Sequence, residues 1–551
     1  MIREILTEGV RLKFDDAAQV ISLDCPQDIT WDDQGLAKSV AELRPGKFAS
    51  ASVLAAKAKA FDDGLIAAVD VAAQNGAGTF AGKAGFLAKL AACTGLAAPL
   101  VHGARALGAG SAPPAGEAAK LVEEFLADEG ASKPLGFYTW SPALENIFRQ
   151  DRFLQQALEE PVFAAVVRAL DAEAQLRVHY EAWMSLNERL TNPLTRPNLR
   201  PALAALDGGT APAFVRGIAI SPPSESPEGA LVKRLFGNTP IPEGFNLADR
   251  LIEEIRKGRV DLTPSSISGW YDRIAWSLET LAAPDRGAEA KKLDLSKSYR
   301  ETLEALFKGI LALARESHVK QLEQPCAGCG PPRPKIRPEL SVEPLPTHYL
   351  RRALGYRFVR EVLEGAFGAG ALKALRRLTA GGPVATPLGD ELAQMESLFF
   401  GAHAASCAEI GLAPDPQAPP ASGEAFRCWV ERLTEDEDLK QDNRMMVPVF
   451  YDVARRQTKV WAFLGWTSRP LTAQFRTPPD VEVVAAVEKK GWFGFGGKKA
   501  EAPEIEFEDA KYALIYPVTA EVYVTKRLNR DEFRAHCDRH RSQKEILASL
   551  R

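Results

Sequence analysis

The sequence lacks the features that would assign it to a membrane, an export route or an oxidising compartment. No stretch of the 551 residues approaches the roughly 20 consecutive apolar residues of a membrane-spanning helix. The start, MIREILTEGVRLKFDD, lacks the basic and apolar regions of a signal peptide. The seven cysteines are odd in number and widely scattered, which argues against a disulfide framework and for a reducing compartment. We therefore expect a cytoplasmic protein.

A surplus of one charge and a recognisable catalytic motif are also missing. The formal net charge is −4, so there is no global electrostatic case for nucleic acid, and none is expected as a partner. No GxSxG, HExxH, GxGxxG or P-loop pattern stands in its proper context. Carboxylates are plentiful on the expected helices, but the sequence alone places no pair of them across a cleft. The sequence therefore names no reaction.

What the sequence does contain is an ordinary globular composition, 46% hydrophobic and 25% charged, in a chain too long for one core. Its patterns predict a mainly α fold, with an irregular multi-helical body and a small β-rich (α+β) C-terminal domain. We expect an Ala/Gly-rich, mostly helical N-terminal domain at 1–107 and a large helical domain at 117–440. A β-rich domain ending in a helix is expected at 442–551. The Gly/Ala/Pro composition of segment 108–116 is typical of a linker.

Helix signals dominate up to about residue 440. Ser141-Pro142 and Thr263-Pro264 each combine a capping hydroxyl with a proline suited to a first turn. The longest amphipathic stretch is Leu295–Gln324. Further helices are expected at Thr347–Phe367, Gly389–Ile410 and Glu424–Leu433.

Strand signals occur at both ends of the chain. Val10–Leu23 is predicted to form a short hairpin with its turn near Asp15-Asp16. In the C-terminal part, Val447–Val453 and Lys459–Gly465 are expected to form a hairpin, because both are β-type runs separated by a short polar turn. Further strands are predicted at Leu471–Arg476, Tyr512–Tyr516 and Val518–Thr525, and Asn529 is predicted to cap a final helix.

The most specific local feature is the segment Cys326-Ala-Gly-Cys329-Gly. Two thiolates separated by two residues can bind one metal ion, and the following glycine permits the tight turn of a zinc knuckle. No second CxxC exists, so the other ligands would have to come from elsewhere. His403 and Cys407 stand four residues apart, on one face of an expected helix. The sequence thus suggests a structural zinc site at Cys326, Cys329, His403 and Cys407; the alternatives are a chance pair in a Pro-rich loop and a redox pair.

A second unusual segment is KKGWFGFGGKK, at residues 489–499. Its aromatic residues lie between glycines and are bracketed by lysines, which would suit shallow insertion at an anionic membrane or docking on an acidic partner. The residues expected to make this contact are Lys490, Trp492, Phe493, Phe495 and Lys498. The alternative is a long hairpin tip without a partner.

His536 and His540 also stand four residues apart, a spacing at which two imidazoles can bind one metal. No Glu follows the first His, so this is not the zinc-protease signature, and the flanking charges favour a solvated helix face.

Three segments together resemble a known family. Gly136–Arg149 fits G-x-Y-T-x-S-x-x-L-x-x-x-F-R, Val342–Tyr349 fits V-E-P-x-P-x-x-Y, and Ser268–Leu278 resembles an aromatic helix between them. In this order they resemble the bacterial and archaeal family called domain of unknown function 3160, over about residues 120–410. The resemblance implies a helical fold and no established activity. The family's Arg-His-Asp cluster is replaced here by Ala312–Ala314, and family members are usually exported.

Two functions fit these observations. The first is a helical scaffold or interaction protein that binds another protein, or a membrane surface, through its lysine/aromatic segment. The second is a metal-dependent hydrolase with a cleft in the helical domain, using Glu316, His318 and the metal held by the cysteines. The first is favoured because the sequence shows no set of residues that would place a nucleophile next to a general base.

Overall fold

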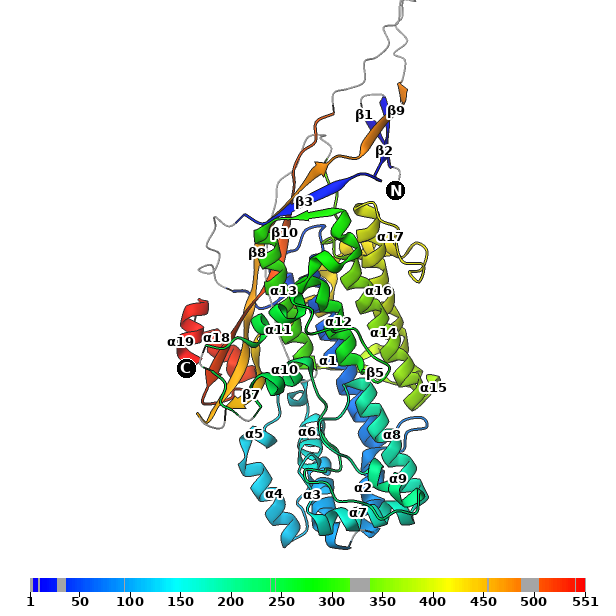
Figure 1. Ribbon diagram of the computed structural model, residues 1–551, viewed down its shortest axis with the longest axis vertical. Helices are drawn as coiled ribbons and strands as arrows, with labels where there is room; N and C mark the ends of the chain where they lie inside the picture. The colour runs from blue at the N-terminus through cyan, green and yellow to red at the C-terminus, as the bar shows by residue number, and fades with distance from the viewer. Residues whose placement is uncertain are drawn as a thin grey trace, which may run out of the picture.

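A computed structural model describes residues 3–7, 10–26, 36–93, 95–237, 239–242, 244–317, 337–452, 455–486, 505–540 and 542–550. A helical body carries a long β ribbon along one side, and three strands extend beyond the body at one end (Figure 1). Helix and strand contents of 55% and 16% confirm the expected fold class. Among the described helices, none combines the length and the apolar character needed to cross a bilayer.

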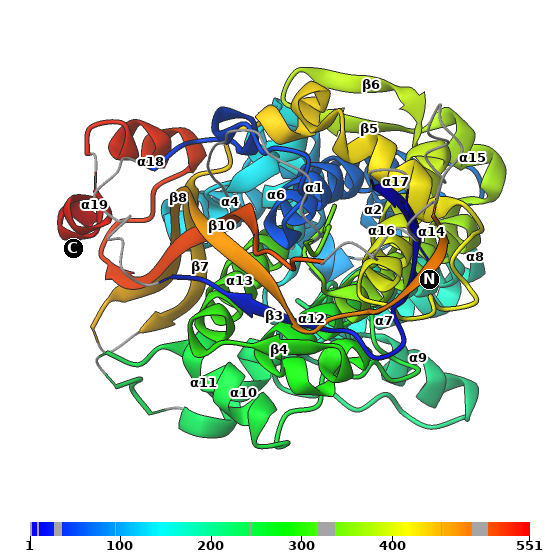
Figure 2. The ribbon, with the colours of Figure 1, turned by 90° about the horizontal axis from the view of Figure 1, so that it is seen from above.

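The N-terminal helices are organised around one buried helix. They are α1 (Ala51–Asn75), α2 (Lys83–Cys93), α3 (Ala98–Ala109), α4 (Glu117–Ala127) and α5 (Glu129–Ser132). Helix α1 is buried over almost its whole length, and Figure 2 shows it in the interior of the body. Its many Ala residues and Gly64 allow close approach by its neighbours, since a Cβ at Gly64 would lie 2.2 Å from the carbonyl oxygen of Leu378.

The middle of the chain adds helices on several sides of α1. They are α6 (Pro142–Leu154), α7 (Glu160–Ala172), α8 (Ala174–Leu190), α9 (Arg200–Asp207), α10 (Pro227–Phe236), α11 (Leu247–Arg256), α12 (Trp270–Ala282) and α13 (Lys297–Ser317). The cap at Ser141 is confirmed, because its hydroxyl accepts from the N–H of Leu144. The helix start at Thr263-Pro264 is wrong: α12 begins at Trp270 after Gly269, whose missing Cβ allows the chain to lie against the carbonyl of Thr191.

The last helices before the sheet are α14 (Pro346–Phe367), α15 (Ala369–Ala374), α16 (Leu388–Glu409) and α17 (Ser422–Val430). The three helices expected between residues 347 and 433 are thus confirmed within a few residues. A hairpin of β5 (Arg376–Thr379) and β6 (Gly382–Pro387) joins α15 to α16. The sequence patterns did not predict this hairpin, because its strands are short and partly exposed.

The main sheet is built around two long strands. Strand β8 (Gln457–Thr477) pairs antiparallel with β10 (Ala510–Val524), and also with β7 (Met445–Asp452) and β3 (Val20–Asp24); β4 (Leu293–Leu295) extends the sheet beyond β3. The expected hairpin of β7 and β8 is confirmed. The strand expected at Leu471–Arg476 is instead the far half of β8, and the last two expected strands are one strand, β10, with an irregularity between Val518 and Thr519.

The predicted hairpin at Val10–Leu23 is wrong. Strand β2 (Val10–Asp15) pairs with β1 (Arg3–Thr7) and β9 (Asp480–Ala486), whereas β3 joins the main sheet. The strands separate because their apolar residues enter different cores: Leu12 and Phe14 pack with Val481 and Ile505, away from the core of the body.

One hydrophobic core connects the three expected domains. It includes residues from β3 to the last helix, and α1 contacts both α13 and β10. The C-terminal helices are α18 (Arg530–Cys537) and α19 (Gln543–Leu550). The predicted cap at Asn529 is confirmed as a capping box with Glu532. The composition of the chain changes near residues 107 and 440, where boundaries were expected. Residues on both sides of each position belong to this core.

Candidate functional site

The expected metal site is described only in part. Cys326 and Cys329 lie outside the described residues, as does His318. His403 and Cys407 lie one turn apart on α16, both buried, with the Cys407 Sγ 3.8 Å from each ring nitrogen of His403. The helical-face prediction for this pair is therefore confirmed.

Both ring nitrogens of His403 have protein partners. Nδ1 lies 2.9 Å from the carbonyl oxygen of Pro346, and Nε2 lies 2.8 Å from the backbone nitrogen of Asp415. Because that N–H must donate, Nε2 accepts and Nδ1 carries the proton, which leaves no lone pair on this ring for a metal. Burial lowers the pKa of His403, in agreement with a neutral ring. Among the described residues, no three His, Cys, Asp or Glu side chains form a group suited to a metal ion.

The second histidine pair also has a structural contact. The rings of His536 and His540 lie 5.2 Å apart, and His536 Nε2 is 2.7 Å from the hydroxyl of Ser549. This contact connects α18 to α19. The lysine/aromatic residues Lys490 to Lys498 lie outside the described residues.

Glu316, considered above for the hydrolase, is part of an ion-pair network in the core. Its carboxylate lies 2.6 Å from the Lys59 ammonium, which also contacts Asp63. Asp63 and Lys59 come from α1, so this network joins α1 to α13. All three side chains are almost completely buried. Because the carboxylate is buried and paired with a cation, we assign Glu316 a structural role.

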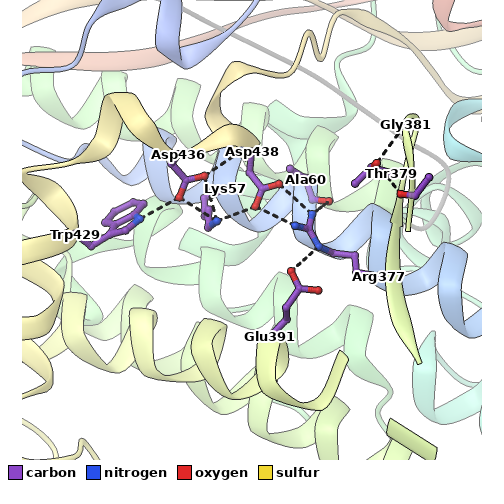
Figure 3. A network of polar contacts seen from close by, with 10 residues as sticks. Lys57, Ala60, Arg377, Thr379, Gly381, Glu391, Trp429, Asp436 and Asp438 are labelled. Carbon is purple, nitrogen blue, oxygen red and sulfur yellow. Dashed lines mark hydrogen bonds and ion pairs between the residues drawn. The ribbon is translucent and has the colours of Figure 1, made fainter. Parts of the chain in front are cut away.

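A second network on α1 is shown in Figure 3. The ammonium of Lys57 lies 2.7 Å from Asp438 and 3.0 Å from Asp436, and the Arg377 guanidinium lies 3.0 Å from both Asp438 and Glu391. Burial raises the pKa of Asp438, but Lys57 and Arg377 together lower it below its usual value. The network connects α1, β5, α16 and the segment before β7, and every charge in it has an opposite partner.

Two of the three segments that carry the family resemblance, Gly136–Arg149 and Ser268–Leu278, meet at a cleft, here called the Tyr138 cleft. It has a volume of about 320 Å³ and is lined by residues from α1, the segment before α6, α6 itself, α8, the loop 221–226, α12 and α13. Tyr138 belongs to the first motif segment and Tyr271 to the aromatic helix, and both line the cleft. Phe148 lies against the Tyr138 ring, with 5.1 Å between their centroids.

Three acids line the cleft, Asp70, Asp151 and Glu225, and the first two are held by other side chains. Tyr138 donates to Asp70 over 2.5 Å, and both oxygens of Asp151 lie 2.6 Å from the Lys83 ammonium. Burial, followed by the charges of Asp70 and Asp151, holds the pKa of Tyr138 well above its usual value. The phenol is therefore a fixed hydrogen-bond donor at neutral pH.

The opposite wall is built on Glu228. This buried carboxylate accepts from the Tyr271 hydroxyl over 2.6 Å and from Arg315 over 2.9 Å, and Arg315 also donates to the hydroxyl of Ser226. Burial and the Glu228 charge raise the pKa of Tyr271 well above its usual value. Ser226 in turn caps α10 by accepting from the N–H of Gly229, so this wall is fixed by contacts from three segments.

Three arginines from distant parts of the chain lie close enough for their charges to act on one another: Arg152 on α6, Arg196 after α8 and Arg527 before α18. Together they are called the Arg152 cluster. Arg152 lines the cleft. It donates to the Gln155 side chain over 3.0 Å, and Arg196 donates to the Gln155 carbonyl over 2.9 Å. Within the described residues, none of the three guanidinium groups has a carboxylate at ion-pair distance, unlike nearby Lys133, which lies 3.2 Å from Glu532.

Electrostatics confirm that the three arginines share one environment. Burial lowers the pKa of Arg152, the charges of Arg527 and Arg196 lower it further, and the charge of Asp128 acts in the opposite direction. Burial also lowers the pKa of Arg527, whereas the charges of Asp128 and Glu129 raise it. An added anion would remove this mutual repulsion.

No protein-family model, curated protein or solved structure matches this chain. The resemblance to domain of unknown function 3160 therefore stays a prediction. Sequence reasoning did find two of the segments at the cleft, but not the Arg152 cluster, because three single arginines in separate segments carry no pattern in the sequence.

Proposed function

We propose that this protein is a helical binding protein whose Tyr138 cleft holds a small polar ligand with a phosphate or similar anionic group. The observation that carries the proposal is the Arg152 cluster, three half-buried cations without an ion-paired carboxylate among the described residues, one of which, Arg152, lines the cleft. Cations are rarely placed together in this way without an anion, since their repulsion and desolvation both cost free energy.

The remainder of the cleft suits the polar body of such a ligand. Thr191, Ser221 and Ser224 line its wall near α8 and the loop 221–226, and the Thr191 hydroxyl donates to the carbonyl of Asn187 over 2.7 Å. Arginine is well matched to phosphate, because its planar group donates two parallel hydrogen bonds. The acids Asp70 and Asp151 do not oppose this ligand strongly, since the Tyr138 hydroxyl and the Lys83 ammonium already occupy them.

Two sequence predictions remain proposals beside this one. The scaffold could also contact a protein or a membrane surface through the lysine/aromatic segment, and a zinc ion could join Cys326 and Cys329. Metal-dependent hydrolysis is the alternative function, but of the residues named for it, Glu316 is held by Lys59.

Titration calorimetry with inorganic pyrophosphate at low ionic strength tests the proposal. We expect binding in the micromolar to millimolar range, weakened about tenfold or more by Arg152→Gln, because a charge-assisted hydrogen bond contributes about 1.5–3 kcal/mol. Arg527→Gln should act in the same direction, and thermal unfolding of the variant checks that its fold is intact. Arg149→Gln is the matched control, because Arg149 lies on the same helix and pairs with Glu145.

Two results would overturn the proposal. One is the absence of binding by pyrophosphate and by a sugar phosphate at millimolar concentration. The other is equal loss of affinity in Arg149→Gln and Arg152→Gln, which would indicate a diffuse charge effect without a site.

A further inference from the structure

A second cavity lies between α2, α8 and α14, and is called here the Phe358 groove. Its volume is about 530 Å³, within the range of about 300–1,000 Å³ that is usual for small-molecule sites. Phe80, Phe86, Trp183, Leu186 and Phe358 form much of its apolar wall.

Small residues on two helices keep the groove open. Gly365 and Ala366 on α14 face Ala182 and Ser185 on α8 across it. A Cβ at Gly365 would meet no atom within 4 Å, so the space above this helix face is empty of protein. At the rim, Val178 is 65% exposed. An apolar surface that is left open in this way costs free energy in the free protein and is available to a ligand.

One end of the groove is cationic. The Phe358 ring lies 3.9 Å from the Arg273 guanidinium and 4.6 Å from that of Arg189, measured to the ring centroid. Arg189 donates to the backbone carbonyl of Ser266, and the buried Nε of Arg273 has no hydrogen-bond partner. Within the part of the chain that the structure describes, neither arginine has a carboxylate at ion-pair distance. Of the acids, Glu361 acts most strongly on the pKa of Arg273. Glu361 also lines the groove, with an exposed side chain that makes no ion pair with Arg189 or Arg273 among the described residues.

The other cation of the groove is neutralised. Lys83 lies 5.9 Å above the Trp183 ring, but its ammonium is bound by both oxygens of Asp151. Lys83 lines the Phe358 groove and Asp151 lines the Tyr138 cleft, so this ion pair separates the two cavities. The charge available to a ligand in the groove is therefore at the Arg189 end.

We propose that the Phe358 groove binds an alkyl carboxylate of the fatty-acid class. The carboxylate pairs with Arg189, beside Arg273, and the alkyl chain lies against Phe80, Phe86 and Trp183. A guanidinium group donates to a carboxylate through two parallel hydrogen bonds, and burial of the alkyl chain against the apolar wall favours binding. This site is independent of the one proposed at the Tyr138 cleft, because it involves different side chains and an apolar ligand.

Calorimetric titration of the full chain with dodecanoate tests this inference. We expect saturable 1:1 binding, and about tenfold weaker binding of dodecanol and of dodecyltrimethylammonium. Gly365→Leu, which fills the groove, should weaken dodecanoate binding at least about tenfold. Arg189→Gln should reduce the affinity for dodecanoate to that for dodecanol and leave dodecanol binding unchanged. Gly370→Leu, at another exposed helical glycine without neighbours, is the matched control, and thermal unfolding of each variant checks its fold.

Three results would overturn the inference. The first is no dodecanoate binding below its micellar concentration. The second is equal affinity for the carboxylate and the trimethylammonium compound, which would indicate unspecific adsorption of alkyl chains. The third is a dimer in solution that Gly365→Leu dissociates, which would make the groove an interface between two copies of the chain.

Discussion

Protonation of one buried carboxyl group should make the stability of this protein depend on pH. Glu343 is completely buried, and its two oxygens accept from the N–H of Ala51 and from the hydroxyl of Tyr299, each over 2.8 Å. Ala51 is the first residue of α1, so this side chain satisfies one of the N–H groups that the helix itself leaves unpaired. Glu343 is also the glutamate of the V-E-P segment identified in the sequence.

Burial raises the pKa of Glu343 from 4.5 to about 7, against the opposing effect of these two hydrogen bonds. The folded protein therefore binds this proton more readily than the unfolded chain between pH 4.5 and 7. Its contribution to stability is complete below pH 4.5 and is lost as the pH rises through 7. Because one pKa unit corresponds to 1.36 kcal/mol, the loss amounts to about 3 kcal/mol at pH 8.

The substitution Glu343→Gln removes this titration and keeps one oxygen acceptor for Ala51. We expect the free energy of unfolding of the variant, relative to wild type, to rise by about 3 kcal/mol between pH 5 and pH 8. Urea unfolding at constant ionic strength measures the difference, with Glu123→Gln, an exposed position on α4, as the control. Parallel pH profiles for wild type and Glu343→Gln would refute the reasoning. A change of opposite sign would show that the start of α1 holds the carboxylate ionised.

Two further substitutions test the packing around α1 and α13. Lys57→Met leaves the buried Asp438 without one of its two cations and should reduce the free energy of unfolding by about 3 kcal/mol; Lys47→Met, at an exposed ion pair, should cost less than about 1 kcal/mol in the same denaturant titration. Gly309→Ala places a Cβ 1.9 Å from the Pro517 ring and should lower stability by about 1–3 kcal/mol; a thermal midpoint equal to that of wild type would contradict the close packing of α13 on β10.

Local signals in the sequence predicted elements well and their partners poorly. The caps at Ser141 and Asn529 were predictable because a capping side chain bonds within three residues of itself. The β7–β8 hairpin was predictable for the same reason, since its strands are joined by a short turn. The pairing of β3 with β8 was not predictable. An alternation of period two indicates a strand but does not indicate which strand pairs with it.

Buried charge was the other limit of prediction. Charged residues on a helix usually indicate a face turned to solvent, but Lys59, Asp62 and Asp63 are buried. In the structure α1 is interior, and Asp62 meets its partners Arg352 and Tyr356 from α14. The length and alanine content of α1 favoured a helix, but no local pattern shows that partners hundreds of residues away will supply the opposite charges.

The way in which buried charges are paired explains where the candidate sites lie. Every charge on α1 that is buried has an opposite charge or a hydrogen-bond partner within the protein, so those networks need no ligand. The Arg152 cluster and the pair Arg189 and Arg273 lack such a carboxylate among the described residues, and each lies beside a cavity. Stability alone gives no reason to place cations beside an open cavity, since Coulomb repulsion and desolvation both oppose it. An anionic ligand offsets the repulsion, and for that reason the two sites without an ion-paired carboxylate among the described residues, and not the ion-paired networks, are the places to look for function.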